Sequence, residues 1–311
     1  MTQHIVKIGT RGSPLARLQA QMVADELTAR HADVRAELVV IETSGEWKPA
    51  QGETRLSEQE GGKGLFIKEI EAALLRGDVD CAVHSMKDVP SFLPKGAAVD
   101  HVLPRADVRD ALISHKAQTI ESLPLGALVG TSSLRRQSFL LHIRPDLQVV
   151  PLRGNVQTRL DKLADGQVDA TFLAMAGLKR LGIDGAFVHP ISPERIMPAC
   201  GQGIIAIETR LDDEATRQLL DAIHDRDTGL CAAAERAALQ VLDGSCHTPI
   251  GAFAVMREDT LNFTVAVGSA DGAGFWQESG KSAVHSTADA AAFAAALAVR
   301  LKETLPAGAL E

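Results

Sequence analysis

The chain has 311 residues, which predicts about two domains at roughly 150 residues each. Hydrophobic residues make up 45% and charged residues 23% of it, an ordinary globular composition that excludes a disordered chain, a collagen and a coiled coil. A net charge of −8 and the absence of tyrosine argue against a nucleic-acid-binding protein, which needs basic surfaces and aromatic side chains for base stacking.

The apolar stretches and the first residues of the sequence predict where the protein is located. Every apolar stretch is much shorter than the ~20 residues of a membrane span, and residues 1–10 enter a strand-like alternation without a basic and then apolar leader. We therefore expect a cytoplasmic protein with no membrane partner. Reduced thiols are expected there, and the cysteines lack metal-binding or redox spacing, which argues against a disulfide framework or a zinc site. They are Cys81, Cys200, Cys231 and Cys246.

The first part of the chain alternates strand and helix signals. Residues 5–9 (IVKIG) predict a strand, and Ser13-Pro14 predicts a helix start, because serine is a good N-cap and proline suits the first turn. Residues 44–64 form a polar, glycine-rich segment of a length that is commonly functional. The other predicted elements are a strand at Ala36–Ile41, a helix at Leu65–Arg76 and a strand at Val79–His84.

The next part repeats that order. GTRGSPLAR (9–17) resembles GTSSLRR (130–136), and LLRGDVDCAV (74–83) resembles LADGQVDATF (163–172). We therefore predict two similar βαβαβ domains with mostly parallel sheets. The elements of the second are a strand at 127–130, a helix from Ser132 or Ser133 to about Ile143, a strand at 147–152, a helix at Asn155–Ala164 and a strand at 168–174.

The remaining segments set the predicted domain boundaries. Proline-bearing connections at 89–96 and 189–203 predict hinges, and residues 203–208 predict a strand that returns to the first sheet. From about Asp227 the pattern becomes helix, three strands and helix, which predicts a separate α+β domain. Its elements are Gly229–Val241, Ile250–Met256, Thr260–Val267, Phe275–Lys281 and Ala288–Leu301. The predicted domains are 1–103 with 203–223, then 104–202, then 224–311.

Two predicted strand-to-helix turns, Gly9–Ser13 and Gly130–Ser133, place backbone N–H groups and hydroxyls at a helix N-terminus, where anions bind. Cations gather at the same strand ends, where open α/β sheets bind ligands. Because the planar guanidinium fork pairs with carboxylate or phosphate and no Walker or GxGxxG motif is present, we expect a small polyanionic ligand. The cations are Arg11, Arg135, Arg136, Arg153, Arg159, Lys179 and Arg180.

Residues 84–90 (HSMKDVP) place Lys87 and Asp88 at the mouth of a predicted strand. An ionised Asp88 can hold a cationic intermediate or exchange a proton, whereas we expect His84 to pack or hydrogen bond. Cys246 lies in a glycine- and serine-containing loop where its sulfur is accessible and His247 favours the thiolate. This chemistry alone leaves a functional and a passive thiol equally open.

Eight segments taken in order resemble the porphobilinogen deaminase family, also called hydroxymethylbilane synthases. They are TRGSPLA, GGKGLFIKE, VHSMKDVP, VGTSSLRRQ, LRGNVQTRL, LAMAGLKRLG, GQGIIAIE and GSCHTPIGA, and they span residues 10–252. The resemblance implies two domains like type II periplasmic binding proteins with a cleft between them, and a small C-terminal α+β domain. It also implies a monomeric transferase of haem biosynthesis that joins four porphobilinogens head to tail, releases ammonia and yields hydroxymethylbilane.

The resemblance also implies roles for particular residues. A dipyrromethane cofactor would be held by a thioether to Cys246, and Asp88 would contact pyrrole N–H groups and steady a methylene-pyrroleninium cation; no metal is implied. Further cofactor-binding residues would be Lys87, Thr131, Ser133, Arg135, Arg136 and Arg159. Substrate-binding residues would be Arg11, Ser13, Arg153, Arg180, Lys63 and Phe66.

Two rival classes stay open at this point. A two-lobed binder of small anions would use the same turns but would need neither Cys246 nor the Lys87-Asp88 pair. A cysteine hydrolase would use Cys246 with His247, although adjacent side chains seldom face each other and the sequence offers no orienting acid. The mass of the intact protein discriminates them, because only the deaminase carries a covalent two-pyrrole group.

Overall fold

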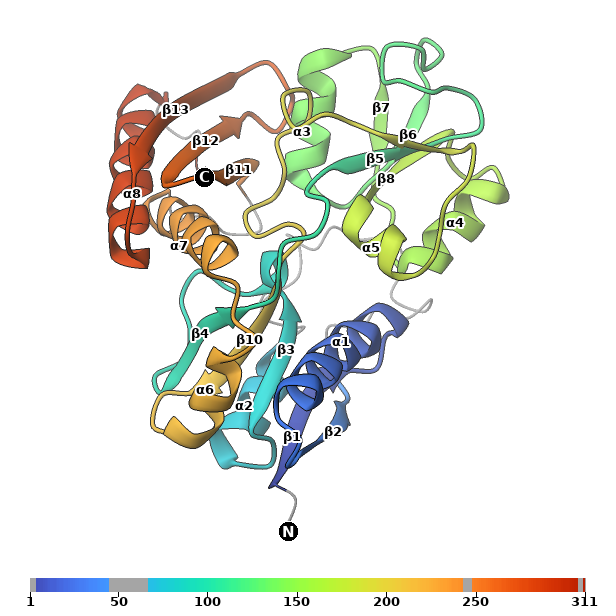
Figure 1. Cartoon of the computed structure of the whole chain (residues 1–311). Helices are drawn as coiled ribbons and strands as arrows, with labels where there is room; N and C mark the ends of the chain where they lie inside the picture. The colour runs from blue at the N-terminus through green and yellow to red at the C-terminus, as the bar shows by residue number, and fades with distance from the viewer. Residues whose placement is uncertain (1–3, 45–66, 243–247, 307–309, 311) are drawn as a thin grey trace. The chain divides into compact units, whose positions relative to one another are not determined.

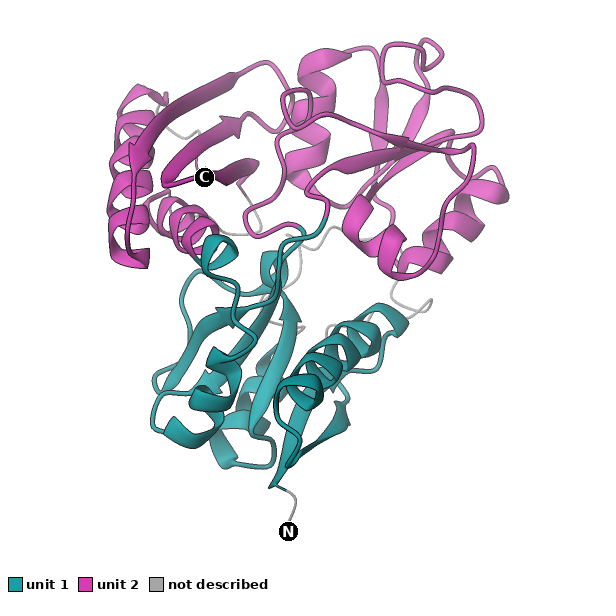
Figure 2. Cartoon of the chain, viewed as in Figure 1, with its two compact units in different colours: residues 1–46, 63–106, 203–229 teal, residues 47–62, 107–202, 230–311 magenta. Residues whose placement is uncertain are grey.

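The computed structural model describes residues 4–44, 67–242, 248–306 and 310 (Figure 1). These residues divide into two compact units (Figure 2). Unit 1 comprises the described residues of 1–46, 63–106 and 203–229, and unit 2 those of 107–202 and 230–311. Unit 2 contains two separate sheets, so each of the three predicted domains has a sheet of its own.

The sheet of unit 1 has five strands in the order β2-β1-β3-β10-β4. The first three are parallel, and β10 runs antiparallel between β3 and β4. This confirms that the chain returns to the first sheet after residue 203. The strands are β1 (His4–Arg11), β2 (Val34–Ile41), β3 (Cys81–Ser85), β4 (Ala97–Val102) and β10 (Ile205–Arg210).

Four helical segments accompany this sheet. The Ser13 hydroxyl caps α1 (Pro14–Arg30) by accepting a hydrogen bond from the Ala16 N–H, as the Ser-Pro pair predicted. The buried face of α1 brings Val23 and Leu27 into a core with Ile8 of β1. The other segments are α2 (Lys68–Arg76), the short 3₁₀ helix η4 (Met86–Asp88) and α6 (Glu214–Asp221).

The first sheet of unit 2 has the order β7-β6-β8-β5-β9, with β5 in the position that β10 has in unit 1. Its strands β6, β7 and β8 are parallel, and β5 is antiparallel to β8 and β9. The internal repeat is thus confirmed as one topology used twice. Its elements are β5 (Asp110–Ile113), β6 (Leu128–Gly130), α3 (Leu134–Ile143), β7 (Gln148–Val150), α4 (Val156–Ala164), β8 (Ala170–Ala174), α5 (Met175–Arg180) and β9 (Val188–Pro190).

The second sheet of unit 2 is an antiparallel meander covered by α8 (Figure 1). Phe139 of α3 packs with Ala266 and Phe275 of this meander, and the two phenylalanine rings are 5.2 Å apart. This shared core explains why both sheets belong to one unit. The elements are α7 (Arg226–Val241), β11 (Ile250–Arg257), β12 (Thr260–Gly268), β13 (Phe275–Ala283) and α8 (Thr287–Thr304).

The predicted fold class, two βαβαβ domains and a small C-terminal α+β domain, is confirmed by these strand orders. The strands β4, β5 and β9 were not identified from the sequence. The hinge role of residues 89–96 and 189–203 stays a prediction.

Candidate functional site

The carboxyl ends of β1 and β3 place two oppositely charged predicted residues together in unit 1. Arg11 is the last residue of β1, and Asp88 closes the 3₁₀ helix that follows β3. The Arg11 Nη2 atom lies 4.0 Å from Asp88 Oδ2, and the side chains are 23% and 31% exposed. Because the carboxylate is only partly covered, it can meet a ligand while Arg11 balances its charge.

Two hydroxyl groups lie beside this pair in the sequence and at the same strand ends. Ser13 Oγ accepts a 3.3 Å hydrogen bond from the Ala16 N–H, and such a hydroxyl still has a proton to donate to an anion. Ser85 exchanges hydrogen bonds with the Gln19 side chain of α1, at 2.9 and 3.1 Å. Lys87 follows directly in η4. Together, Arg11, Ser13, Lys87 and Asp88 form what we call the unit 1 site.

His84 lies beneath the unit 1 site and has a structural partner. Its Nε2 atom is 3.0 Å from Glu208 Oε2 on the neighbouring strand β10, and the two side chains are 4% and 0% exposed. The expectation that His84 hydrogen bonds inside the fold is confirmed. Burial and the Glu208 charge raise the pKa of Glu71 nearby.

The corresponding turn of unit 2 is held by a chain of local hydrogen bonds. The Thr131 N–H donates to Val150 O at 2.8 Å, Thr131 Oγ1 accepts from the Ser133 N–H at 3.2 Å, and Ser133 Oγ accepts from the Arg136 N–H at 3.4 Å. Glycine is required before them, since a Cβ on Gly130 would lie 2.8 Å from a Leu152 methyl group. Of the two predicted N-cap candidates, Ser132 and Ser133, the N-cap is Ser133.

Arg135 and Arg136, which follow that turn in α3, both contact a buried carboxylate. Both are 6% exposed, and they meet Asp110, which is 0% exposed, at the start of β5. Arg135 Nη2 donates to Asp110 Oδ2 and Arg136 Nη2 to Asp110 Oδ1, each at 2.7 Å. Gln202 Nε2 donates to the same Oδ1 at 3.0 Å. We call Asp110, Arg135, Arg136 and Gln202 the Asp110 cluster.

One further nitrogen of each guanidinium group binds a backbone oxygen. Arg135 Nη1 donates to Met197 O, and Arg136 Nη1 donates to Phe172 O at 2.9 Å. Burial alone would raise the pKa of Asp110, but the two arginine charges outweigh it and hold that pKa well below its usual range. Burial lowers the pKa of Arg135. The aspartate is therefore ionised and fixed.

Sequence reasoning missed Asp110 and Gln202. Both carried a signal: Asp110 is a charged residue that opens the apolar run DALI, and Gln202 lies between two glycines of the GQG segment. A charged residue inside an otherwise buried strand needs a partner of opposite charge, and that rule alone would have marked the aspartate.

The other predicted cations of unit 2 also follow strand ends. Arg153, 5% exposed, follows β7, and its carbonyl accepts a 2.9 Å bond from Lys162. Arg159 Nε donates to Gly154 O at 2.9 Å. Burial lowers the pKa of Arg180 at the end of α5. The Lys179 ammonium pairs with Asp107 at 2.8 Å.

Three predicted site residues, Lys63, Phe66 and Cys246, lie outside the described residues, and their roles stay predictions. Of the other cysteines, Cys81 and Cys231 are buried, and burial raises the pKa of the Cys81 thiol to about 12. This supports a passive role for both. Within the described ranges there is no cluster of potential metal ligands, and no helix there is long and apolar enough to cross a membrane.

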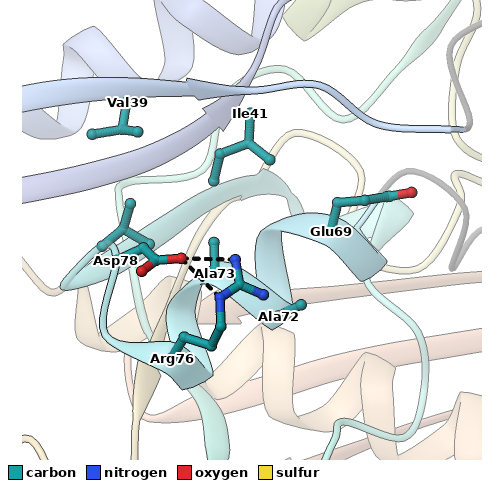
Figure 3. A pocket seen from close by; sticks show the side chains of 8 residues that line it. Val39, Ile41, Glu69, Ala72, Ala73, Arg76 and Asp78 are labelled. Carbon is teal, nitrogen blue, oxygen red and sulfur yellow. Dashed lines mark hydrogen bonds and ion pairs between the residues drawn. The ribbon is translucent and has the colours of Figure 1, made fainter.

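A cavity of about 370 Å³ lies elsewhere in unit 1, between β2 and α2 (Figure 3). Its wall is mostly aliphatic, with Val39, Ile41 and Ala73, and Arg76 is already paired with Asp78 at 2.7 Å on its rim. None of the predicted site residues lines it. A polyanion would not be bound by such a lining, so the candidate sites are the strand ends.

Known proteins resemble this chain along most of its length. The family model "Porphobilinogen deaminase, dipyromethane cofactor binding domain" matches residues 6–218, and "Porphobilinogen deaminase, C-terminal domain" matches residues 229–303. The porphobilinogen deaminase of Nitrobacter winogradskyi is 47% identical over 304 residues, covering 97% of this chain and 94% of the relative. That of Paracoccus denitrificans is 47% identical over 307 residues, covering 98% and 96%.

A plant relative and a solved structure extend the comparison. The chloroplastic porphobilinogen deaminase of Oryza sativa subsp. japonica is 46% identical over 283 residues, covering 88% of this chain and 77% of the relative. The structure of an ABC transporter periplasmic substrate-binding protein from Coxiella burnetii covers 74% of this chain and 96% of its own, at 17% identity and a TM-score of 0.40. On the family models and the relatives, this chain belongs to the porphobilinogen deaminase family.

Proposed function

We propose that this protein is a transferase that condenses four porphobilinogen molecules head to tail, releases ammonia and yields hydroxymethylbilane for haem biosynthesis. Membership of the porphobilinogen deaminase family supports this proposal. The structural observation that carries it is the row of arginines and capping hydroxyls at the strand ends of two sheets with the same topology. We further propose that it acts in the cytoplasm as a monomer.

The charge of the ligand explains the arginines. Each porphobilinogen brings an acetate and a propionate, so the growing chain gains two carboxylates at every condensation. Guanidinium groups bind carboxylates through two parallel hydrogen bonds, which fixes both position and orientation. We assign this role to Arg11, Arg153 and Arg180 for the incoming substrate, and we propose that Ser13, Lys63 and Phe66 make further contacts with it.

The residues of unit 2 fit the dipyrromethane group that the family carries. Arg136 Nε is buried and has no hydrogen-bond partner in the described chain, so it can donate to a carboxylate of that group. When bound, the group supplies a nucleophilic pyrrole carbon for the first condensation. Cys246 would hold it through a thioether, and the residues contacting its carboxylates would be Lys87, Thr131, Ser133, Arg135, Arg136 and Arg159.

Asp88 is the proposed catalytic residue. Loss of ammonia from porphobilinogen leaves an electron-poor methylene-pyrroleninium cation, which a nearby carboxylate stabilises by charge and by accepting the pyrrole N–H. Asp88 is partly exposed and lies 4.0 Å from Arg11, so it can approach the substrate while the arginine limits its movement. The neighbouring arginine also offers a contact for a substrate carboxylate.

The experiment is a stoichiometry assay on purified protein. Given porphobilinogen, the wild-type chain should release four ammonia molecules for each hydroxymethylbilane formed, and Asp88→Asn should release almost none. A two-lobed anion binder would return porphobilinogen unchanged, and that result would overturn the proposal.

A further inference from the structure

Asp110 joins three segments that are distant in the sequence. It opens β5, its arginine partners begin α3, and Gln202 precedes β10. Gln202 is itself fixed, since Nε2 also donates to Val108 O at 2.7 Å. One fully buried carboxylate thus receives three side-chain donors, two of them charged.

The charges of the Asp110 cluster do not balance. Two guanidinium groups, each 6% exposed, share one carboxylate, which leaves one positive charge in excess among the described residues. An uncompensated buried charge is costly, because it loses hydration without gaining a counterion. The cluster is therefore built to take one more anionic group.

The hydrogen bonds of the two arginines also identify a donor that is available to that group. Asp110 occupies Nη2 of both arginines, and the carbonyls of Met197 and Phe172 occupy Nη1 of both. Arg136 Nε is buried and has no hydrogen-bond partner in the part of the chain described. Because Asp110 fixes the guanidinium planes, it also fixes the direction of this remaining donor.

Resting on the proposed function, we infer that Asp110 is a positioning residue for the dipyrromethane cofactor. It orients Arg135 and Arg136, and it leaves them a single excess positive charge that one cofactor carboxylate neutralises. The aspartate touches neither cofactor nor substrate; it acts through the two arginines.

The test compares full-length variants by intact mass, thermal unfolding and far-ultraviolet circular dichroism. Asp110→Asn removes the charge and Asp110→Glu restores it one methylene further out. Leu112→Ala is the matched control, because Leu112 lies on the same strand, is fully buried and belongs to the core around Phe139. It destabilises unit 2 without changing the charge of the cluster.

We expect Asp110→Asn to reduce the fraction of chains carrying the two-pyrrole adduct at least roughly tenfold, since its arginines lose their counterion. Asp110→Glu should recover part of that fraction, and Leu112→Ala should keep the adduct despite a lower Tm. A wild-type level of adduct in Asp110→Asn, or a loss no greater than in a control with the same fall in Tm, would overturn the inference.

Two further outcomes are decisive. If Asp110→Asn yields no folded protein, Asp110→Glu and Gln202→Met carry the test, because the first displaces the carboxylate that orients both arginines and the second removes one of the donors that hold it in place. Full adduct in both of these variants then overturns the inference. A wild-type chain without adduct overturns the proposed function itself, which separates that failure from the failure of the Asp110 assignment.

Discussion

The unit 1 site and the Asp110 cluster arise at strand ends of the same topology, yet they treat a carboxylate in opposite ways. Asp88 is 31% exposed, and the nearest Arg11 nitrogen is 4.0 Å away. Asp110 is 0% exposed and is held by two arginines at 2.7 Å each. The two carboxylates therefore differ in burial, although the sheets that carry them have the same topology.

This difference indicates a division of labour. A loosely paired, accessible carboxylate can change its contacts as each substrate arrives, whereas a desolvated and fully bonded carboxylate holds a fixed group in place. We therefore assign chemistry to the unit 1 site and retention of the cofactor to the Asp110 cluster. Substitutions in the unit 1 site should therefore reduce turnover, whereas substitutions in the Asp110 cluster should reduce the fraction of chains that carry the cofactor.

The largest expected effect is on turnover at the unit 1 site. Asp88→Asn keeps the shape and removes the charge that stabilises the cation, so kcat should fall by ~10² or more, with an unchanged far-ultraviolet spectrum. Asp88→Glu keeps the charge but displaces it, and should retain measurable activity. Equal rates for the Asn and Glu variants would contradict a central role for this carboxylate.

For stability we expect the reverse order: a substitution in the Asp110 cluster should lower the free energy of unfolding more than a substitution in the unit 1 site. Asp110→Asn leaves two buried guanidinium groups without their carboxylate and should lower the free energy of unfolding by about 3 kcal/mol or more. Arg11→Leu breaks a partly exposed pair and should cost at most about 1 kcal/mol. Urea denaturation of both variants measures this contrast, and similar losses would remove the distinction between the two regions. Arg136→Leu should reduce the fraction of chains that carry the cofactor. Arg136→Lys should reduce this fraction less, but should still reduce it, because lysine cannot bind as a planar fork.

The strand-to-helix turns of both regions could be predicted from the sequence. The difference in burial between Asp88 and Asp110 could not. Ser13 and Ser133 could be recognised as N-caps because a cap is a local pattern. Asp110 could be marked as a charge ahead of an apolar run, but its partners could not be named, since β5 has only four residues and Arg135 is 25 positions away. Gln202 is 92 positions from Asp110. Pairings over such separations follow from the strand order, which places β5 at the antiparallel position of its sheet.

The acid response is a smaller effect. The pKa of Asp110 is below its ordinary value of 3.8 in the folded chain, so this group stabilises the fold above that pH. The contribution is lost as pH falls below 3.8 toward the folded pKa. Wild-type Tm should therefore decline in that range more steeply than the Tm of Asp110→Asn. Parallel curves would show that the aspartate is not held ionised by its arginines.

The smallest expected effect is that of salt. Screening acts over ~10 Å at 0.1 M and is strongest for exposed charges, so added salt should raise KM for porphobilinogen through groups such as Arg11. The buried cluster is shielded from ions, and the fraction of chains with adduct should not change. Loss of adduct in moderate salt would contradict the burial of its anchoring charges.

The central claim is that one covalent primer carries the growing chain, and intact mass spectrometry after brief exposure to porphobilinogen tests it most directly. Wild-type protein should show a constant two-pyrrole adduct and a ladder of added pyrrole units. Cys246→Ser cannot form the thioether and should show neither, whereas Cys81→Ser, Cys200→Ser and Cys231→Ser should show both. A ladder that survives in Cys246→Ser would contradict the account.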